Sequence, residues 1–195
     1  MYILFEGIDT CGKSTQIARL KEEFPAAILT KEPGGTAFGV QAREILLSDI
    51  LASKRAELLL FLADRAEHYA QIVKNNKHKL VISDRGFLSG IGYALANDDF
   101  DFDHLIELNK FALEEQFPDL IVLFITNIET VQERLKSRNE EADGIEIRGL
   151  EYLMRVQKHM EESLQKLNIP YLLIDATQSI DEIHKTIISE IQRLR

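Results

Sequence analysis

The stretch GIDTCGKST at residues 7–15 holds the residues whose types and spacing point most clearly to chemistry. A glycine followed, after four residues, by Gly-Lys-Ser is the pattern of a phosphate-binding loop, in which consecutive backbone N–H groups surround an anion. Gly7 and Gly12 would allow the backbone angles and the close approach that a side chain obstructs. Lys13 can reach the β- and γ-phosphates of a nucleoside triphosphate, and the Ser14 hydroxyl can bind Mg²⁺. The stretch therefore predicts a triphosphate site with a magnesium ion.

The sequence around this stretch supports the prediction. An apolar run precedes it, and a helix is expected to begin at Lys13, so the loop would join a strand to a helix N-terminus, as the motif requires. A helix N-terminus favours a bound anion through its dipole and its free N–H groups. Asp9 is unusual in such a loop, because a carboxylate is repelled by a bound triphosphate. We therefore expect Asp9 to face the group that accepts the phosphate.

A second group of candidate residues, Asp84 and Arg85, follows another apolar run, at 80–83. A carboxylate there can lie beside Mg²⁺ or order a water on it, and an arginine can hold a phosphate through two parallel hydrogen bonds. Asp-Arg pairs are common on protein surfaces. The position after a strand is what makes this pair a candidate for the metal and for the acceptor phosphate.

Two more segments add candidates on the acceptor side. TKEPGGT, at 30–36, also follows an apolar run and places Glu32 near the same edge. Phe61 and Arg65 are four residues apart and share one helix face. An aromatic ring beside a guanidinium suits a planar base, which the ring can stack on while the arginine bonds a carbonyl. The spacing alone also leaves open a core phenylalanine and a surface arginine.

These candidates depend on elements that bring them to one edge. Short apolar runs without strict alternation are typical of strands covered on both faces, and they predict strands at Tyr2–Phe5, Ala27–Thr30, Leu80–Ser83, Leu120–Ile125 and Tyr171–Ile174. Helices are expected at Lys13–Phe24, about 39–51, Lys54–Asn75, Asp103–Gln116, Ile128–Ser137, about 147–167 and Ile180–Leu194, the last capped by Thr177 or Ser179. Strands separated by helices predict an α/β three-layer sandwich, a five-stranded parallel sheet with helices on both faces. Ligands in such folds bind at the carboxyl ends of the strands, where the candidates lie.

Composition excludes several other classes of protein. The 195 residues include 23 Lys and Arg against 32 Asp and Glu, a net charge of −9, which argues against a nucleic-acid polymer as partner. The only cysteine, Cys11, cannot form an internal disulfide, which fits a reducing compartment. There is no signal-peptide pattern, and the longest apolar run, at 120–125, is too short to span a bilayer. We therefore expect a cytoplasmic protein with no membrane partner.

The pattern along the chain predicts one domain over residues 1–195, because no linker interrupts it. The polar stretch NEEADG at 139–144 has no apolar face and follows Arg134 and Arg138, which share a helix face. It predicts a mobile lid at about 134–148.

Five segments, in this order and spacing, resemble those of bacterial thymidylate kinases: FEGIDTCGKST, TKEPGGT, FLADR, SDRGFLSGIGY and IDATQSIDEIH. The resemblance runs over essentially the whole chain, whereas other P-loop kinases share the first segment but not the rest. It implies the P-loop kinase fold and transfer of the γ-phosphoryl group of Mg-ATP to dTMP, giving dTDP and ADP. The family commonly forms dimers, so a homodimer is implied as well.

The resemblance also implies roles residue by residue. On the donor side, ATP and Mg²⁺ would be held by Gly7, Gly12, Lys13, Ser14 and Thr15, with Asp84 beside the metal and Ala176 in the adenine-side loop. On the acceptor side, dTMP would be held by Asp9, Glu32, Arg43, Phe61, Arg65, Arg85, Ser89, Gly90 and Tyr93. Phe61 would stack on thymine, Arg65 would bond its O4, and Arg85 would hold its phosphate. Tyr93 would crowd the sugar 2′ position, and Glu32 counts with Asp84 as an acid on the metal side.

The chain departs from the family pattern at three places: in the lid, at Gly86, where an aromatic residue or histidine is usual, and at Thr126-Asn127, where Asp-Val often follows the fourth strand. Members of the bacterial type carry catalytic basic residues in the lid and lack an arginine in the phosphate loop, where this chain has Thr10. This implies that Arg134 and Arg138 approach the transferring phosphoryl group. Gly144 stands where many relatives have arginine, and Arg148 is not in an equivalent position, so which lid arginine acts stays open.

Two other functions stay open as well. Another P-loop nucleotide kinase or a deoxynucleoside kinase would share the loop site, and Phe61 with Arg65 could also serve dUMP. A nucleotide-dependent switch or binding protein would hydrolyse its nucleotide slowly and recruit a partner. The chain has no guanine-specifying Asn-Lys-x-Asp motif, and two convergent anion sites suit a phosphate acceptor better than a switch.

Overall fold

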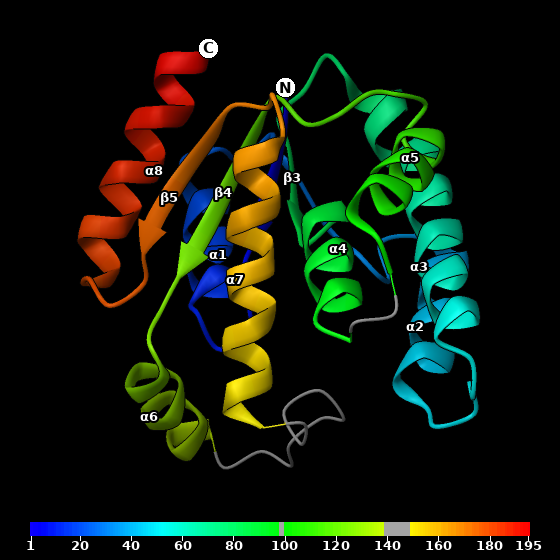
Figure 1. Ribbon diagram of the computed structural model, residues 1–195. Coiled ribbons are helices and arrows are strands. Elements are labelled where there is room, and N and C mark those ends of the chain that lie inside the picture. The colour runs from blue at the N-terminus through cyan, green and yellow to red at the C-terminus, as the bar shows by residue number, and fades with distance from the viewer. Residues whose placement is uncertain (98–99, 139–148) are drawn as a thin grey trace.

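The computed structural model describes residues 1–97, 100–138 and 149–195, with side chains described throughout these ranges except at 136–138. Within them a five-stranded parallel sheet lies between layers of helices, as the sequence predicts (Figure 1). Figure 1 shows α4 and α7 in front of the sheet and α1 behind it, with α8 packed against α1. In the described ranges, no helix combines the length and the apolar character needed to cross a membrane.

The strands are β1 (Tyr2–Glu6), β2 (Ile28–Lys31), β3 (Val81–Asp84), β4 (Leu120–Ile125) and β5 (Tyr171–Asp175). All five predicted strands are present, and four of them extend one residue further than expected, into a charged residue. The ladder of backbone hydrogen bonds, not apolarity, decides where a strand ends. Asp84, for example, lies in register with Phe5 on one side and with Lys31 on the other.

The strand order β2-β3-β1-β4-β5 puts β1 in the centre of the sheet. The chain first builds the β2–β3 side and then crosses to β4 and β5, so the order reverses beside β1. Crevices at the carboxyl ends of the strands at such a reversal are where parallel α/β sheets bind ligands. The loop after β1 therefore lies at the position in the fold best suited to a ligand.

The α-helices are α1 (Lys13–Glu23), α2 (Ala37–Leu47), α3 (Lys54–His68), α4 (Phe87–Leu95), α5 (Phe102–Ala112), α6 (Ile128–Arg138), α7 (Leu150–Lys166) and α8 (Ile180–Leu194). Ser179 caps α8 through a reciprocal capping box with Glu182, which decides between the two predicted caps. The span predicted as a helix over 54–75 is helical, but its form changes. α3 ends at His68, and a π-helical turn, η1 (Tyr69–Val73), and a 3₁₀ turn, η2 (Lys74–Asn76), follow it directly.

Helix α4 was not predicted, and two glycines in its sequence, FLSGIGYAL, lower its helix propensity. Tertiary contacts form it instead. The carboxylate of Glu6, fully buried at the end of β1, accepts hydrogen bonds from the backbone N–H groups of Leu88 and Ser89, both at 3.2 Å. These are free donors of the first turn, so Glu6 caps the helix from another element.

Candidate active site

The segment after β1 forms the loop that the sequence predicts to bind phosphate. Gly7 and Gly12 have φ angles of 141° and 100°, which side chains rarely adopt, and a Cβ at Gly7 would lie 2.9 Å from the carbonyl oxygen of Phe124. α1 begins at Lys13, so the N–H groups of its first turn, which lack partners within the helix, lie at the loop. The loop borders a cavity, here called the loop cavity, which is lined by residues 9–16 and by Asp84, Arg85, Phe124, Arg134, Gln178, Ile180 and Ile183.

Lys13 is held against the loop by hydrogen bonds to two backbone carbonyl oxygens and, at 3.5 Å, to Sγ of Cys11. Its Nζ donates to the carbonyl oxygens of Gly7 and Ile8, each at 2.9 Å, and the residue is only 6% exposed. Ser14 and Thr15 follow it along the wall of the loop cavity. The structure thus brings the predicted donor-side residues 12–15 together around one cavity.

The predicted metal residues also meet at this cavity. The Ser14 hydroxyl donates to Oδ2 of Asp84 at 3.4 Å. Oδ1 of Asp84 is buried and has no hydrogen-bond partner among the described residues. Mg²⁺ usually binds to one or two protein oxygens and completes its shell with water and substrate phosphates. A serine hydroxyl beside a carboxylate with an unbonded oxygen fits that requirement.

Arg134 reaches the loop cavity from α6, but by a contact that the sequence does not suggest. Its guanidinium donates to the carbonyl oxygens of Thr10 at 3.0 Å and Ala176 at 2.7 Å. It therefore ties the phosphate loop to the turn after β5. Ala176, predicted on the adenine side, is fully buried, and its carbonyl oxygen is joined to the cavity wall by Arg134.

Most of the predicted lid lies outside the residues that the structure describes. Residues 139–148, with Gly144 and Arg148, are not among the described residues, and the side chain of Arg138 is not described either. The assignment of Arg138 to the transferring phosphoryl group remains a prediction.

A second cavity lies between α2, α3 and α4 and is here called the helix cavity. The predicted acceptor-side residues line it: Asp9, Glu32, Arg43, Phe61, Arg65, Arg85, Ser89, Gly90 and Tyr93. Phe61 and Arg65 do share one face of α3, since both reach this cavity. Arg65 is only 2% exposed, so the alternative of a surface arginine is wrong. Asp9 and Arg85 line the loop cavity as well, so the two cavities meet at these residues.

Where the cavities meet, Asp9 and Arg85 form an ion pair. Arg85 also donates to the carbonyl oxygen of Gly7 at 3.0 Å and to Ser89 Oγ at 3.2 Å, while the Tyr93 hydroxyl donates to the second oxygen of Asp9 at 3.2 Å. Burial alone would raise the pKa of Asp9, but the charges of Arg85 and Lys13 outweigh it and hold that pKa below its ordinary value. The expected position of Asp9, facing the acceptor side, agrees with this geometry.

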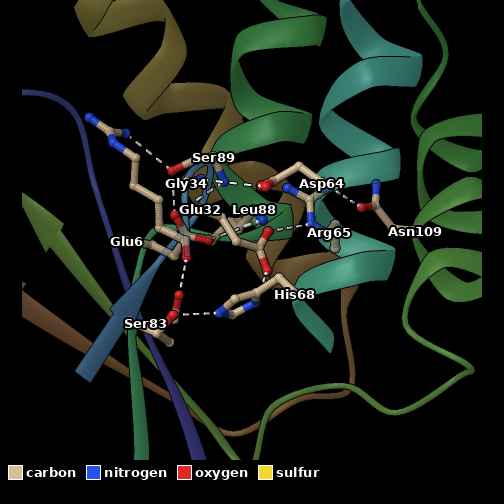
Figure 2. Close-up of polar contacts among 12 residues, drawn as sticks. Glu6, Glu32, Gly34, Asp64, Arg65, His68, Ser83, Leu88, Ser89 and Asn109 are labelled. Carbon is tan, nitrogen blue, oxygen red and sulfur yellow. Dashed lines mark hydrogen bonds and ion pairs between the residues drawn. The ribbon is translucent and has the colours of Figure 1, made fainter. Parts of the chain in front are cut away.

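Glu32 and Arg65 form a buried pair on the wall of the helix cavity (Figure 2). Arg65 Nε donates to Oε2 of Glu32 at 2.8 Å, and Nδ1 of His68 lies 2.8 Å from Oε1. Burial would raise the pKa of Glu32, but the charge of Arg65 and the bond to His68 lower it overall. Both oxygens of Glu32 are therefore bonded to protein side chains. Glu32 lines the helix cavity and does not line the loop cavity. The expectation that Glu32 is a metal-side acid is therefore wrong.

Several residues of this network were missed by sequence reasoning. His68 lies three residues after Arg65, and this helical spacing on the same face could have indicated it. Glu6, a carboxylate at the end of an apolar strand, also carries a signal, because such a group must find partners when buried. Asn109, which accepts a hydrogen bond from Arg65, has no recognisable signal, because it is a single polar residue on another helix.

Asp64, also missed, gives a test of the buried network through pH. The residue is 1% exposed, and one carboxylate oxygen accepts a hydrogen bond from the Gly34 N–H at 3.4 Å. Burial, with the charge of Glu32, raises the pKa of Asp64 to about 6. Because the folded chain holds this proton more tightly than the unfolded chain, stability is lost as the pH rises from about 4 to above 6. Asparagine does not titrate, so this loss is absent in Asp64→Asn. Between pH 4 and pH 8, we expect the free energy of unfolding of Asp64→Asn, relative to that of the parent, to rise by up to about 3 kcal/mol.

Urea unfolding at several pH values would measure this gain, with Asp103→Asn, at an exposed position on α5, as the control. A difference between Asp64→Asn and the parent that stayed constant with pH would show that Asp64 does not titrate in this range.

Comparison with known proteins places this geometry in a family. The family model for thymidylate kinase matches residues 5–187. A thymidylate kinase of Sulfurovum sp. (strain NBC37-1) is 67% identical over 97% of this chain and 98% of its own, and one of Campylobacter concisus (strain 13826) is 57% identical over 96% of each. The crystal structure of thymidylate kinase from Ehrlichia chaffeensis superposes with a TM-score of 0.76 at 27% identity, covering 98% of both chains. The phosphate loop, the joined cavities and these similarities lead to one conclusion: the chain belongs to the thymidylate kinase family.

Proposed function

We propose that this chain transfers the γ-phosphoryl group of ATP to dTMP, giving dTDP and ADP. The observation that carries the proposal is that Asp9 and Arg85 line both cavities. A triphosphate on the loop and a monophosphate in the helix cavity would therefore meet at one place. The thymidylate kinases that this chain matches support dTMP as the acceptor.

The proposed reaction is a direct in-line transfer. An oxygen of the dTMP phosphate attacks the γ-phosphorus while the bond to the β–γ bridging oxygen breaks, so ADP leaves and no covalent enzyme intermediate forms. The enzyme then contributes alignment and positive charge. Lys13 and the N–H groups of the loop stabilise the triphosphate and the charge that develops on the γ-phosphoryl oxygens, and Arg85 holds the acceptor phosphate in line.

Mg²⁺ would be held by Ser14, with Asp84 beside it, and would neutralise charge on the phosphates. Asp9, kept ionised by its lowered pKa, orients Arg85 and Tyr93. Phe61 would stack on the base and Arg65 would donate to it, while Ser89, Gly90, Tyr93 and Arg43 complete the acceptor site. Arg134 would border the nucleotide from the wall of the loop cavity, with Arg138 nearby in a lid over about 134–148.

We further propose that residues 1–195 act as one domain within a cytoplasmic homodimer. Large apolar side chains are exposed on α2, α3 and α5, which pack side by side: Phe38, Val40, Leu47, Leu59, Leu108 and Phe111, the last 86% exposed. A second copy of the chain would cover such a surface. Cys11, buried as a free thiol, suits a reducing compartment. Light scattering coupled to size exclusion would test the dimer.

The experiment that tests the function is ADP release from Mg-ATP with a panel of acceptors: dTMP, dUMP, dCMP, AMP, GMP, thymidine and none. Release with dTMP well above dUMP and the others is expected. A preference for another acceptor would keep phosphoryl transfer and overturn the base assignment. Slow release that ignores the acceptor would overturn the kinase and favour a nucleotide-dependent switch.

A further inference from the structure

The guanidinium of Arg65 is held from two sides by buried groups. Its Nε donates to Oε2 of Glu32 at 2.8 Å, and its Nη1 donates to Oδ1 of Asn109, on α5, at 2.7 Å. Figure 2 shows Arg65 between these two partners. Glu32 is 4% exposed and Asn109 is 1% exposed. Bonds in such surroundings hold a side chain far more firmly than bonds in water.

Asn109 can offer only its oxygen to Arg65. Its Nδ2 donates to the carbonyl oxygen of Leu105, one turn earlier on the same helix, at 2.7 Å. The reverse orientation of the amide would place an NH₂ group against the N–H groups of Arg65 and an oxygen against a carbonyl oxygen. The helix backbone thus fixes the amide, and the amide fixes Arg65.

Glu32 is fixed in a similar way. His68 bonds Oε1 through Nδ1 at 2.8 Å, and its Nε2 lies 2.7 Å from the hydroxyl of Thr30. With Nε and Nη1 engaged, Arg65 still has unbonded N–H groups, since a guanidinium carries five. Nη2 has no hydrogen-bond acceptor among the residues that the structure describes, and it lies 3.4 Å from the position of a Cβ built on Gly90, which also lines the helix cavity. The absence of a side chain at Gly90 leaves this donor uncovered.

We propose that Asn109 is a positioning residue: it holds Arg65 as a fixed hydrogen-bond donor and so makes the helix cavity select bases with a carbonyl oxygen at that edge. Thymine and uracil offer an acceptor there, whereas cytosine offers an amino group. Two donors that face each other in a buried site are both left unbonded, which is strongly unfavourable. This inference rests on the proposed function, because it requires a pyrimidine monophosphate in the helix cavity.

The first test is Asn109→Ala, which leaves Nη1 of Arg65 without its partner and lets the guanidinium turn. The KM for dTMP is expected to rise about tenfold, since a hydrogen bond to a charged group is lost. The kcat with dTMP and the KM for ATP should stay within about twofold, because neither the loop nor the phosphate contacts change. The preference for dTMP over dCMP should fall by a similar factor.

Two further variants separate positioning from a general loss of stability. Asn109→Asp keeps an acceptor for Arg65 but loses the bond to Leu105, so its KM for dTMP should stay closer to that of the parent than the KM of Asn109→Ala. Gln157→Ala removes another buried amide, which bonds the backbone N–H and carbonyl of Thr126 at 3.0 and 2.9 Å. It should lower the melting temperature without changing the KM for dTMP.

A double-mutant cycle with Arg65→Met decides the question. If Asn109 acts through Arg65, then Asn109→Ala has no further effect on the KM for dTMP in the Arg65→Met background. An independent effect there, or an unchanged KM in a folded Asn109→Ala, would overturn the proposal. Calorimetric titration with dTMP separates this proposal from the proposed function. If the parent protein binds dTMP without phosphorylating it, the proposed function is refuted, but the affinities of the parent and of Asn109→Ala for dTMP can still be compared. If the parent protein does not bind dTMP, both are refuted.

Discussion

Replacing Lys13 by alanine is expected to lower the kcat for dTMP phosphorylation by about 10³-fold, the cost of removing one charged donor from a transition state whose charge spreads over phosphoryl oxygens. The ammonium group is buried at the start of α1 and held by the carbonyl oxygens of Gly7 and Ile8. Its charge therefore lies against the loop that is proposed to bind the triphosphate. The KM for dTMP should change little, because Lys13 does not line the helix cavity. A coupled ADP-release assay measures both quantities.

Lys13 also stabilises the loop, so a control must separate this role from catalysis. Lys21, on the same helix, likewise donates to two backbone carbonyl oxygens, those of Pro25 and Ala27, both at 2.9 Å. Lys21→Ala should lose a comparable amount of thermal stability and keep its kcat. If Lys13→Ala turned over dTMP at near the parent rate, or if both variants lost activity equally, the proposed role of Lys13 would be refuted.

The sequence predicts the donor side well because its signals are local. The phosphate loop, the strand before it and the helix after it lie within residues 2–23, so spacing alone places Gly12, Lys13 and Ser14 together. Asp84 joins them because parallel strands all end at one edge of the sheet. That rule also brings Arg85 to Asp9, 76 residues away in the chain.

The acceptor side depends on contacts that the sequence does not carry. Glu32 reads as one more acid near the metal, yet its partners Arg65 and His68, 33 and 36 residues away, hold it at the helix cavity. Helix α4 has no predicted counterpart: its glycines lower helix propensity, and Glu6, from β1, supplies its cap. In both cases burial of a charged group with its partners outweighs the local preference of the chain.

The change of helix type after α3 is a further feature that the sequence does not predict. The apolar periodicity runs on through residue 75, but the backbone widens into a π-helical turn at Tyr69–Val73, which shifts the face that later residues present. The periodicity of apolar residues does not distinguish these two backbone forms, so the sequence predicts the helical span but not the change of helix type within it.

Replacing Arg85 by lysine is expected to lower kcat/KM for dTMP by about 10²- to 10³-fold, because lysine cannot reproduce the planar fork of donors that aligns a phosphate. Arg85 bonds Asp9, Ser89 Oγ and the carbonyl oxygen of Gly7 at once. A single ammonium cannot span these partners and an acceptor phosphate together. The KM for ATP should change much less than kcat/KM for dTMP, since the loop that holds the triphosphate is unchanged. Steady-state kinetics with each substrate varied in turn would separate the two effects.

The matched control is Arg19→Lys, since Arg19 also bonds a carboxylate, that of Asp181 at 2.7 Å, but in an exposed pair. Exposed pairs contribute at most about 1 kcal/mol, so this variant should keep the kinetics of the parent. An Arg85→Lys enzyme with nearly the parent kcat/KM for dTMP would show that a point charge suffices at this position. Another group near Asp9, where the two cavities meet, would then have to align the acceptor phosphate. An enzyme impaired equally toward ATP and dTMP would instead indicate that Arg85 acts by holding the phosphate loop through Gly7.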